Sequence, residues 1–182
     1  MTNLEKGNQL CGSWPLPVLL VVPRQHPYAP AAVPRPLREG WGRLSKELPE
    51  VTRLAESPFA RALEDRLIDW SERTGVVVEV WALPKTEVPA PVADAVLATM
   101  TEALENVERH SGAGQVSVAL TVSQSGLRLT VSDDGRGMPA GATGGGLARM
   151  RANFAALGGS LSVNGVPGGG TTVSGAVPVR AV

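Results

Sequence analysis

The chain has 182 residues and a balanced charge, with 17 Lys and Arg residues against 17 Asp and Glu residues. This length suits one domain with a short extension, and the 43% hydrophobic content excludes a chain that is disordered throughout. Zero net charge argues against a general electrostatic surface for nucleic acid, so we expect no direct nucleic-acid partner. The single cysteine, Cys11, excludes an intramolecular disulfide and a cysteine-based zinc cluster.

No stretch of the sequence has the length and hydropathy of a membrane span. Val18–Val22 is the only dense apolar run near the N-terminus, and a spanning helix needs roughly 20 apolar residues. Met1–Leu10 is polar and carries both charge signs, which makes it a poor secretory signal. We therefore predict a cytoplasmic protein with no membrane segment in this chain.

Composition divides the chain into two parts. Eight of the fifteen prolines lie in the first 50 residues, and proline removes a backbone donor and restricts the residue before it. We predict an irregular, proline-rich extension over residues 1–55 and one domain over residues 56–182. Within the extension, Pro23–Pro36 is predicted to be irregular or extended, and Arg38–Glu56 could form a short, interrupted helix.

The domain opens with a predicted helix from Ser57 to Gly75. Ser57 is a capping residue, Pro58 suits the first turn, and apolar residues recur at helical spacing until Gly75 ends the pattern. Val76–Trp81 is β-branched and aromatic, which predicts a strand. After a proline-rich linker, a second helix is predicted from an apolar stripe composed of Val92, Val96, Met100, Ala103, Leu104 and Val107.

The second half of the domain contains two predicted strand pairs around a third helix. The first pair alternates apolar and polar residues on either side of the turn Ser123–Gly126, which is typical of a hairpin. Paired strands with helices between them predict an α+β fold: a two-layer structure in which a mixed sheet has its helices on one face. The predicted elements are Val116–Val122, Leu127–Val131, Leu147–Leu157, Ser160–Val163 and Thr171–Val179.

Glu102 and Asn106 form the first candidate site. They are four residues apart, so they share one face of the second helix. An amide oxygen is a neutral, hard ligand for Mg²⁺, and a carboxylate can orient or deprotonate a water. Taken alone, the pair is more typical of an exposed polar helix face.

Two glycine-rich segments form the second candidate site. Asp133 ends a strand and precedes Gly135 and Gly137, so its carboxylate could accept a hydrogen bond from an exocyclic amine such as that of adenine. Gly144 and Gly146 precede a helix, where free backbone N–H groups attract an anion. Each segment alone is also typical of an ordinary turn or loop, and neither matches a Walker motif or a strong dinucleotide fingerprint.

Three ordered motifs strengthen these assignments when they are taken together. They are EALENVERHSGA at 102–113, DDGRGM at 133–138 and GGGLARMRANFAALGG at 144–159, followed by Gly170-Thr171. In this combination the chain resembles the ATP-binding catalytic domain of sensor histidine kinases, in the superfamily shared with gyrase, the Hsp90 chaperone and MutL. The residues of these motifs most resemble those of the branch that pairs with response regulators carrying helix-turn-helix output domains. The resemblance extends over about residues 59–179.

The resemblance implies a role for each matching residue. Asn106 would coordinate Mg²⁺ on the ATP phosphates, Glu102 would act as a base or orient a water, and Asp133 would accept a hydrogen bond from the adenine amine. Gly144 and Gly146 would cover the triphosphate. The other implied nucleotide contacts are Arg109, His110, Gly135, Gly137, Leu147 and Thr171.

The resemblance implies an ATP-dependent histidine kinase of two-component signalling, with a dimerisation segment or a response regulator as its protein partner. The only upstream histidine, His26, precedes Pro27 and has no acidic neighbour, so we expect phosphate transfer in trans to a histidine of another protein. Two alternatives stay open. One is a non-catalytic ATP-binding regulator, and the other is a Ser/Thr kinase of the anti-sigma-factor type, which shares the ATPase fold.

Overall fold

The computed structural model describes residues 19–21, 57–139, 143–178 and 180. The predictions for Cys11, His26, Pro23–Pro36 and Arg38–Glu56 fall outside this part of the chain. The described elements are β1 (Leu19–Val21), α2 (Pro58–Thr74), β2 (Val77–Ala82), α3 (Ala90–Asn106), η1 (Val107–Ser111), β3 (Gln115–Ser123), β4 (Gly126–Asp133), α4 (Gly145–Ala156), β5 (Ser160–Gly165) and β6 (Thr171–Pro178).

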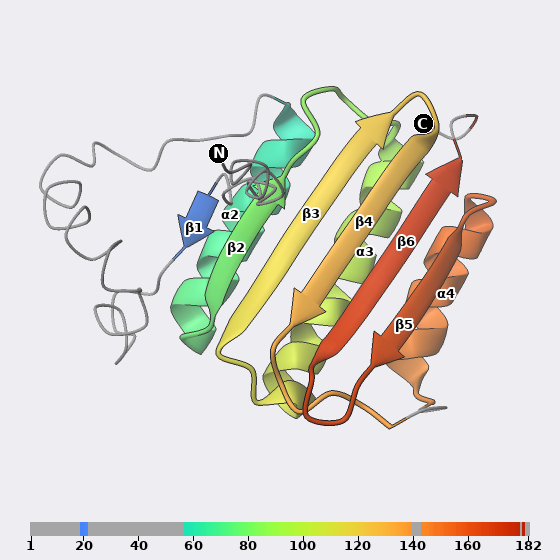
Figure 1. Ribbon diagram of the computed structural model, residues 1–182. Coiled ribbons are helices and arrows are strands. Elements are labelled where there is room, and N and C mark those ends of the chain that lie inside the picture. The colour runs from blue at the N-terminus through green and yellow to red at the C-terminus, as the bar shows by residue number, and fades with distance from the viewer. Residues whose placement is uncertain (1–18, 22–56, 140–142, 179, 181–182) are drawn as a thin grey trace, which may run out of the picture.

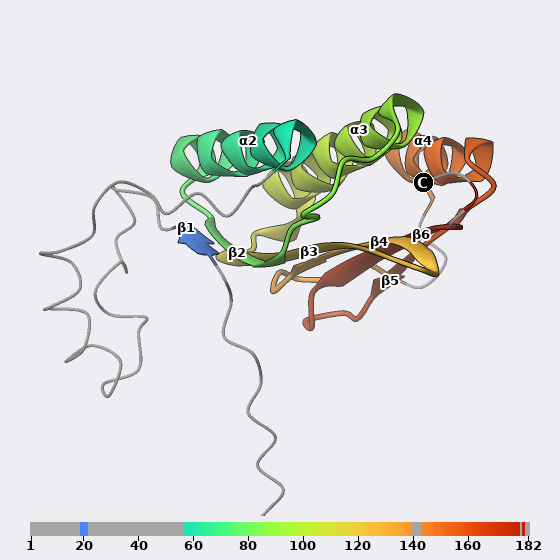
Figure 2. The ribbon, with the colours of Figure 1, turned by 90° about the horizontal axis from the view of Figure 1, so that it is seen from above.

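The fold has two layers, a mixed sheet and a row of helices (Figure 1). The six strands follow the order β1-β2-β3-β4-β6-β5. Strands β2 and β3 are parallel, whereas every other neighbouring pair is antiparallel. Figure 2 shows α2, α3 and α4 on the same face of the sheet, which confirms the predicted α+β architecture. None of the described helices is both long enough and apolar enough to cross a membrane.

Helix α2 begins and ends where its capping residues predict. The Ser57 Oγ accepts a hydrogen bond from the Ala60 N–H at 3.2 Å, which satisfies a donor that the first turn otherwise leaves unpaired. At the other end Gly75 adopts a φ of 79°, in the left-handed region that glycine tolerates. Its N–H donates to the Ser71 carbonyl oxygen at 2.9 Å. Both predicted helix ends are confirmed.

The hydrophobic core lies between the helices and the sheet. All members of the predicted apolar stripe of α3 are buried. From α4 the fully buried Phe154 packs its ring against Gly175 of β6, where any Cβ would overlap the ring. Burial of apolar surface contributes roughly 25 cal/mol per Å² to stability. This packing fixes α3 and α4 relative to β4 and β6.

The predicted hairpin is confirmed, and two further features were not predicted. Ser123 pairs with Gly126 at the turn between β3 and β4. The short strand β1 pairs antiparallel with β2, although it lies within the extension that we predict to be irregular. The apolar run Val18–Val22 is its only signal in the sequence. At the other end of the domain, α3 continues as the π-helical turn η1.

Candidate functional site

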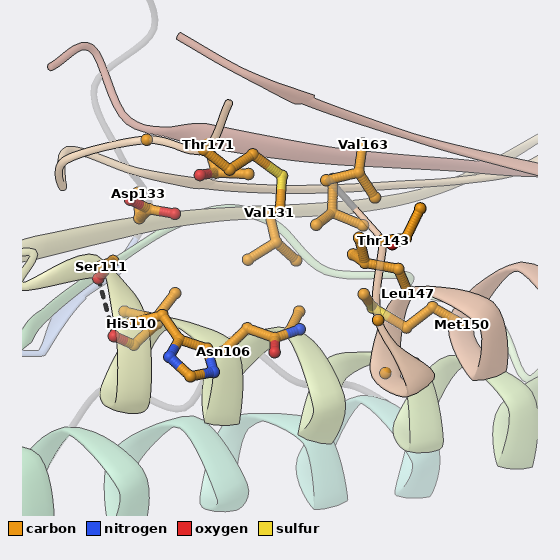
Figure 3. A pocket seen from close by; sticks show the side chains of 17 residues that line it. Asn106, His110, Ser111, Val131, Asp133, Thr143, Leu147, Met150, Val163 and Thr171 are labelled. Atoms are coloured by element: carbon orange, nitrogen blue, oxygen red, sulfur yellow. Dashed lines mark hydrogen bonds between the residues drawn. The ribbon is translucent and has the colours of Figure 1, made fainter. Parts of the chain in front are cut away.

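A pocket of about 190 Å³ opens between α3, the end of β4, the start of β6 and the start of α4 (Figure 3). Eight of the residues predicted to contact a nucleotide line it, although four separate segments of the sequence supply them. The fold therefore brings most of the predicted set to one place. These eight residues are Asn106, His110, Asp133, Gly137, Gly144, Gly146, Leu147 and Thr171.

The remaining walls of the pocket are mostly apolar. Val131, Met150 and Val173 are buried core residues that also line it. Such walls suit a flat, largely uncharged ring. The sequence gives these residues the spacing of core residues, so nothing in the pattern marks them as a site. The lining residues that sequence reasoning missed are Ala103, Val107, Ser111, Val131, Met138, Thr143, Met150, Val163 and Val173.

Helix α3 and the π-helical turn η1 form one wall. The Ser111 Oγ donates to the Val107 carbonyl oxygen at 2.8 Å, and the Ser111 carbonyl oxygen accepts from the Arg136 N–H at 2.9 Å. A Cβ at Gly135 would lie 2.6 Å from the Ser111 Cβ, so this close approach requires glycine. The turn thereby joins the end of α3 to the loop that follows β4, and π-helical turns are frequent at functional sites.

Asp133 is the only carboxylate among the described residues that line the pocket. It ends β4, and its Oδ1 accepts a hydrogen bond from the Gly135 N–H at 2.9 Å. Burial raises the pKa of the Asp133 carboxyl, although backbone hydrogen bonds from Gly135 and Thr171 act in the opposite direction. The Asp133 carboxylate is therefore a partly desolvated acceptor that a donor in the pocket can reach.

The neighbouring Asp134 has a structural role. Its Oδ1 accepts hydrogen bonds from the N–H groups of Gly114 and Gln115, each at 2.9 Å. It therefore braces the start of β3 and does not line the pocket. Of the two adjacent aspartates in the sequence, the structure assigns one to the pocket and one to the scaffold.

The start of α4 forms the opposite end of the pocket from Asp133 (Figure 3). Gly144 is the N-cap residue, and no side chain among the described residues caps this helix. The N–H groups of a first helical turn carry partial positive charge and attract anions. The arrangement thus has an acceptor at one end and backbone donors at the other.

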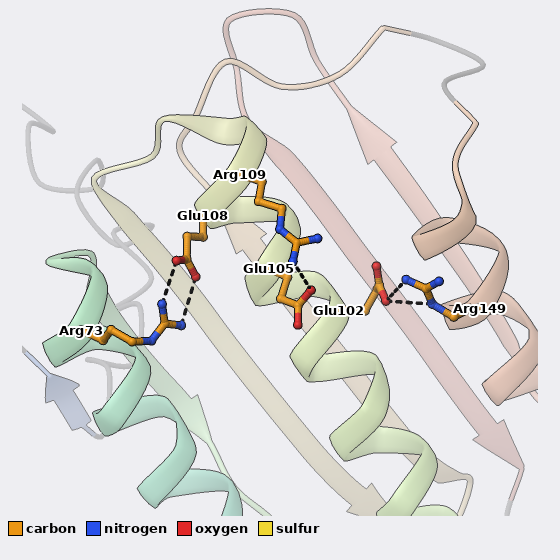
Figure 4. Close-up of polar contacts among 6 residues, drawn as sticks. All are labelled: Arg73, Glu102, Glu105, Glu108, Arg109 and Arg149. Atoms are coloured by element: carbon orange, nitrogen blue, oxygen red, sulfur yellow. Dashed lines mark hydrogen bonds and ion pairs between the residues drawn. The ribbon is translucent and has the colours of Figure 1, made fainter.

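Three predicted residues do not line the pocket: Glu102, Arg109 and Gly135. Gly135 acts on the pocket through its N–H, which donates to the Asp133 Oδ1. The Arg109 side chain is 65% exposed and pairs with Glu105 at 3.1 Å (Figure 4). The Glu102 Oε2 accepts from Arg149 Nε at 3.1 Å and from Arg149 Nη2 at 2.8 Å. Sequence reasoning missed Arg149, because nothing in the local pattern links it to Glu102.

Comparison with known families identifies the domain that contains this pocket. Residues 92–181 match the family described as histidine kinase-, DNA gyrase B- and HSP90-like ATPase. This segment is a histidine-kinase-type ATPase domain. The ATPase domain includes every predicted site residue from Glu102 to Thr171.

Curated proteins similar to this chain include sensor histidine kinases. The chain is 34% identical over 147 residues to sensor histidine kinase MctS of Rhizobium johnstonii, covering 76% of this chain and 31% of that protein. It is 33% identical over 120 residues to sensor histidine kinase LiaS of Bacillus subtilis, covering 64% of this chain and 33% of that protein. The chain thus spans about a third of the length of these curated relatives. It carries the ATP-binding catalytic domain of a sensor histidine kinase.

Solved structures support the same assignment. The blue-light activated histidine kinase of Erythrobacter litoralis EL346 superposes with a TM-score of 0.57 at 27% identity, covering 67% of this chain and 42% of that chain. Its separately solved histidine kinase domain gives a TM-score of 0.55 at 26% identity, covering 68% of this chain and 66% of that chain. The similarity confirms the fold inferred from the sequence.

Proposed function

We propose that the ATPase domain binds Mg-ATP in this pocket and transfers the γ-phosphate to a histidine on another protein. ATP binding follows from the family, whereas the residue roles, the magnesium ion and the acceptor are our proposal. One observation carries it: Asp133, Asn106 and the start of α4 line a single pocket. In this proposal Asp133 would accept from adenine, Asn106 would hold the magnesium ion and the first turn of α4 would bind the phosphates, which is the order that ATP requires.

Adenine is proposed to occupy the end of the pocket near Asp133. The carboxylate would accept a hydrogen bond from the exocyclic amine, and the walls formed by Val131 and Val173 would contact the ring. Thr171 pairs with Asp133 in the β4–β6 register and lines the same end. The backbone hydrogen bonds from Gly135 and Thr171 would remain without the nucleotide, but a base that lacks this amine would cost the partly desolvated carboxylate one donor, so the site would discriminate against such a base.

Asn106 is proposed to hold the magnesium ion. Its side chain lines the pocket between Asp133 and Leu147 (Figure 3). Mg²⁺ takes oxygen ligands and commonly uses one or two protein groups together with substrate phosphates and waters. One amide oxygen beside a phosphate site fits that donor set. When bound, the ion would neutralise charge on the phosphates.

The phosphates are proposed to lie against the start of α4. Gly144 and Gly146 bring backbone close to the ligand, and His110 lines the same pocket. A ring nitrogen of the acceptor histidine would attack the γ-phosphorus as the bond to the leaving oxygen of ADP breaks. The acceptor would be a dimerisation segment, with a response regulator receiving the phosphate next, in the cytoplasm.

Calorimetric titration of the purified chain with ATP, with and without Mg²⁺, tests the binding proposal. Asp133→Ala should abolish measurable binding, because the adenine amine loses its acceptor. Asn106→Ala should remove most of the magnesium-dependent gain in affinity and leave magnesium-free binding unchanged. Asp69→Ala is the matched control, since Asp69 is an exposed carboxylate on α2 and does not line the pocket.

Absence of ATP binding by a folded wild-type chain would refute the proposal. Transfer is tested separately by incubating the chain with ATP labelled at the γ-phosphate and a histidine-containing dimerisation segment. Label that is lost on acid treatment indicates phosphohistidine, whereas acid-stable label indicates a Ser/Thr kinase. Binding without transfer to any segment tried would favour the non-catalytic regulator.

A further inference from the structure

The Glu102 carboxylate lies beside Gly146, at the end of the pocket where the phosphates are proposed to lie. A Cβ added to Gly146, which lines the pocket, would overlap the Glu102 Oε1. The Glu102 side chain is only 16% exposed, so water screens its charge poorly. An anionic ligand at Gly144 and Gly146 would therefore approach a second negative charge.

Arg149 supplies the opposite charge at this point. Two of its guanidinium nitrogens contact one carboxylate oxygen, Glu102 Oε2 (Figure 4). A Cβ at Gly145 would lie 3.7 Å from Arg149 Nη1, so the side chain folds back along the first turn of α4. The positive charge and Glu102 thus sit together at the N-terminal turn of this helix.

We propose that Arg149 neutralises Glu102 and so allows the triphosphate to approach the start of α4. This inference rests on the proposed function and adds a residue to it. Arg149 acts through Glu102, which makes it a positioning residue. Its effect should grow with the number of phosphates on the ligand, because repulsion from an unpaired Glu102 acts on phosphate charge and not on the base.

Two further ion pairs differ from this one in the exposure of their carboxylates. Arg73–Glu108 and Arg109–Glu105 have carboxylate side chains that are 38% and 40% exposed, against 16% for Glu102, whereas the arginine of each pair, Arg149 included, is largely exposed. Exposed pairs of this kind add little to stability. Of these three carboxylates, Glu102 is the one that a Cβ at the pocket residue Gly146 would overlap.

The test compares the affinities of ATP, ADP and AMP, with and without Mg²⁺, for wild type and four variants. Arg149→Ala should weaken magnesium-free ATP binding about tenfold and AMP binding less than about twofold. Mg²⁺ should reduce the loss for ATP, since it neutralises part of the phosphate charge. Arg149→Lys should restore most of the affinity. The double variant Arg149→Ala with Glu102→Gln should restore it too, because the repelling charge is gone.

Arg73→Ala is the matched control, since it removes an exposed arginine and an ion pair away from the pocket, and its nucleotide affinities should equal those of wild type. Equal losses for all three nucleotides, or a loss that the double variant does not repair, would overturn the inference in favour of a purely structural contact between α3 and α4. Unchanged ATP affinity in Arg149→Ala would also overturn it. If the folded wild-type chain binds none of the nucleotides, the proposed function itself fails, and a melting curve for each protein separates that result from unfolding.

Discussion

The two ends of the pocket are built in different ways. The base end, where adenine is proposed to bind, is lined by Ser111, Asp133 and Thr171. It is fixed by strand pairing and by short hydrogen bonds, one of them from the Gly135 N–H to Asp133. The phosphate end, formed by Gly144, Gly146 and Leu147, begins a helix that no side chain of the described residues caps. We infer that the scaffold defines the base end, whereas the phosphate end depends on backbone dipoles and a balance of charges.

The largest expected effect comes from crowding the base end. Gly135→Ala places a Cβ 2.6 Å from the Ser111 carbonyl oxygen and Cβ, and we expect it to lower the free energy of unfolding by about 2 kcal/mol, because backbone must move. ATP affinity should fall with it. Denaturant unfolding measures the change. Gly145→Ala is the matched control at the other end, where the new Cβ meets nothing closer than 3.7 Å, and stability should stay the same or rise by up to about 1 kcal/mol, because alanine has the higher helix propensity.

A smaller and more selective effect is expected at the phosphate end. Gly146→Ala must displace the flexible end of Glu102, so stability should change little. We expect ATP affinity to fall about fivefold and AMP affinity to stay the same, since only the phosphate end is disturbed. Calorimetry with both nucleotides checks this. An equal loss for ATP and AMP would contradict the division of the pocket into two ends.

Lower pH should weaken nucleotide binding through the base end, because that end contains Asp133. Burial raises the pKa of Asp133, and the carboxylate is the form proposed to accept from adenine, so AMP affinity should fall as the pH drops through this raised pKa. The fall should begin above the ordinary aspartate value of about 3.9. In the ligand-free protein the sign reverses: this group stabilises the fold below that value and its contribution is lost as the pH rises through the raised pKa.

Asp133→Asn provides the control for this pH series. It removes the titrating group, so any pH dependence that remains belongs to the nucleotide or to other residues. Affinities of wild type and variant are measured by calorimetry at each pH. Parallel curves for the two proteins would show that Asp133 does not control the base end.

The smallest effect on ATP affinity is expected from a change at Arg109, which does not line the pocket. Arg109 matches the family motif, yet its side chain is 65% exposed and paired with Glu105. In this arrangement Arg109→Ala should change ATP affinity less than about twofold, as for other exposed ion pairs. The same titration measures it. A loss above about fivefold would mean that nucleotide binding draws Arg109 to the phosphates.

Local sequence patterns predicted most helices and strands, because capping and apolar periodicity depend on interactions between residues that are close in the sequence. Ser57 and Gly75 cap α2 as expected, and the apolar stripe of α3 is buried. The π-helical turn was missed, since its stabilising hydrogen bond from the Arg136 N–H to Ser111 joins residues far apart in the sequence. Strand β1 was missed because three residues of an apolar run carry too little periodicity.

The sequence by itself determined the three long helices, the five strands of the domain, their order and the chemical groups available for ATP, because capping, periodicity and short motifs are local properties. Only the tertiary structure decided which of those groups share a pocket. It placed Asp134 against the start of β3, made the core residues Val131 and Met150 part of the pocket wall, and paired Glu102 with Arg149 across two helices. Contacts of this kind depend on how helices and strands pack, and no short stretch of sequence encodes them.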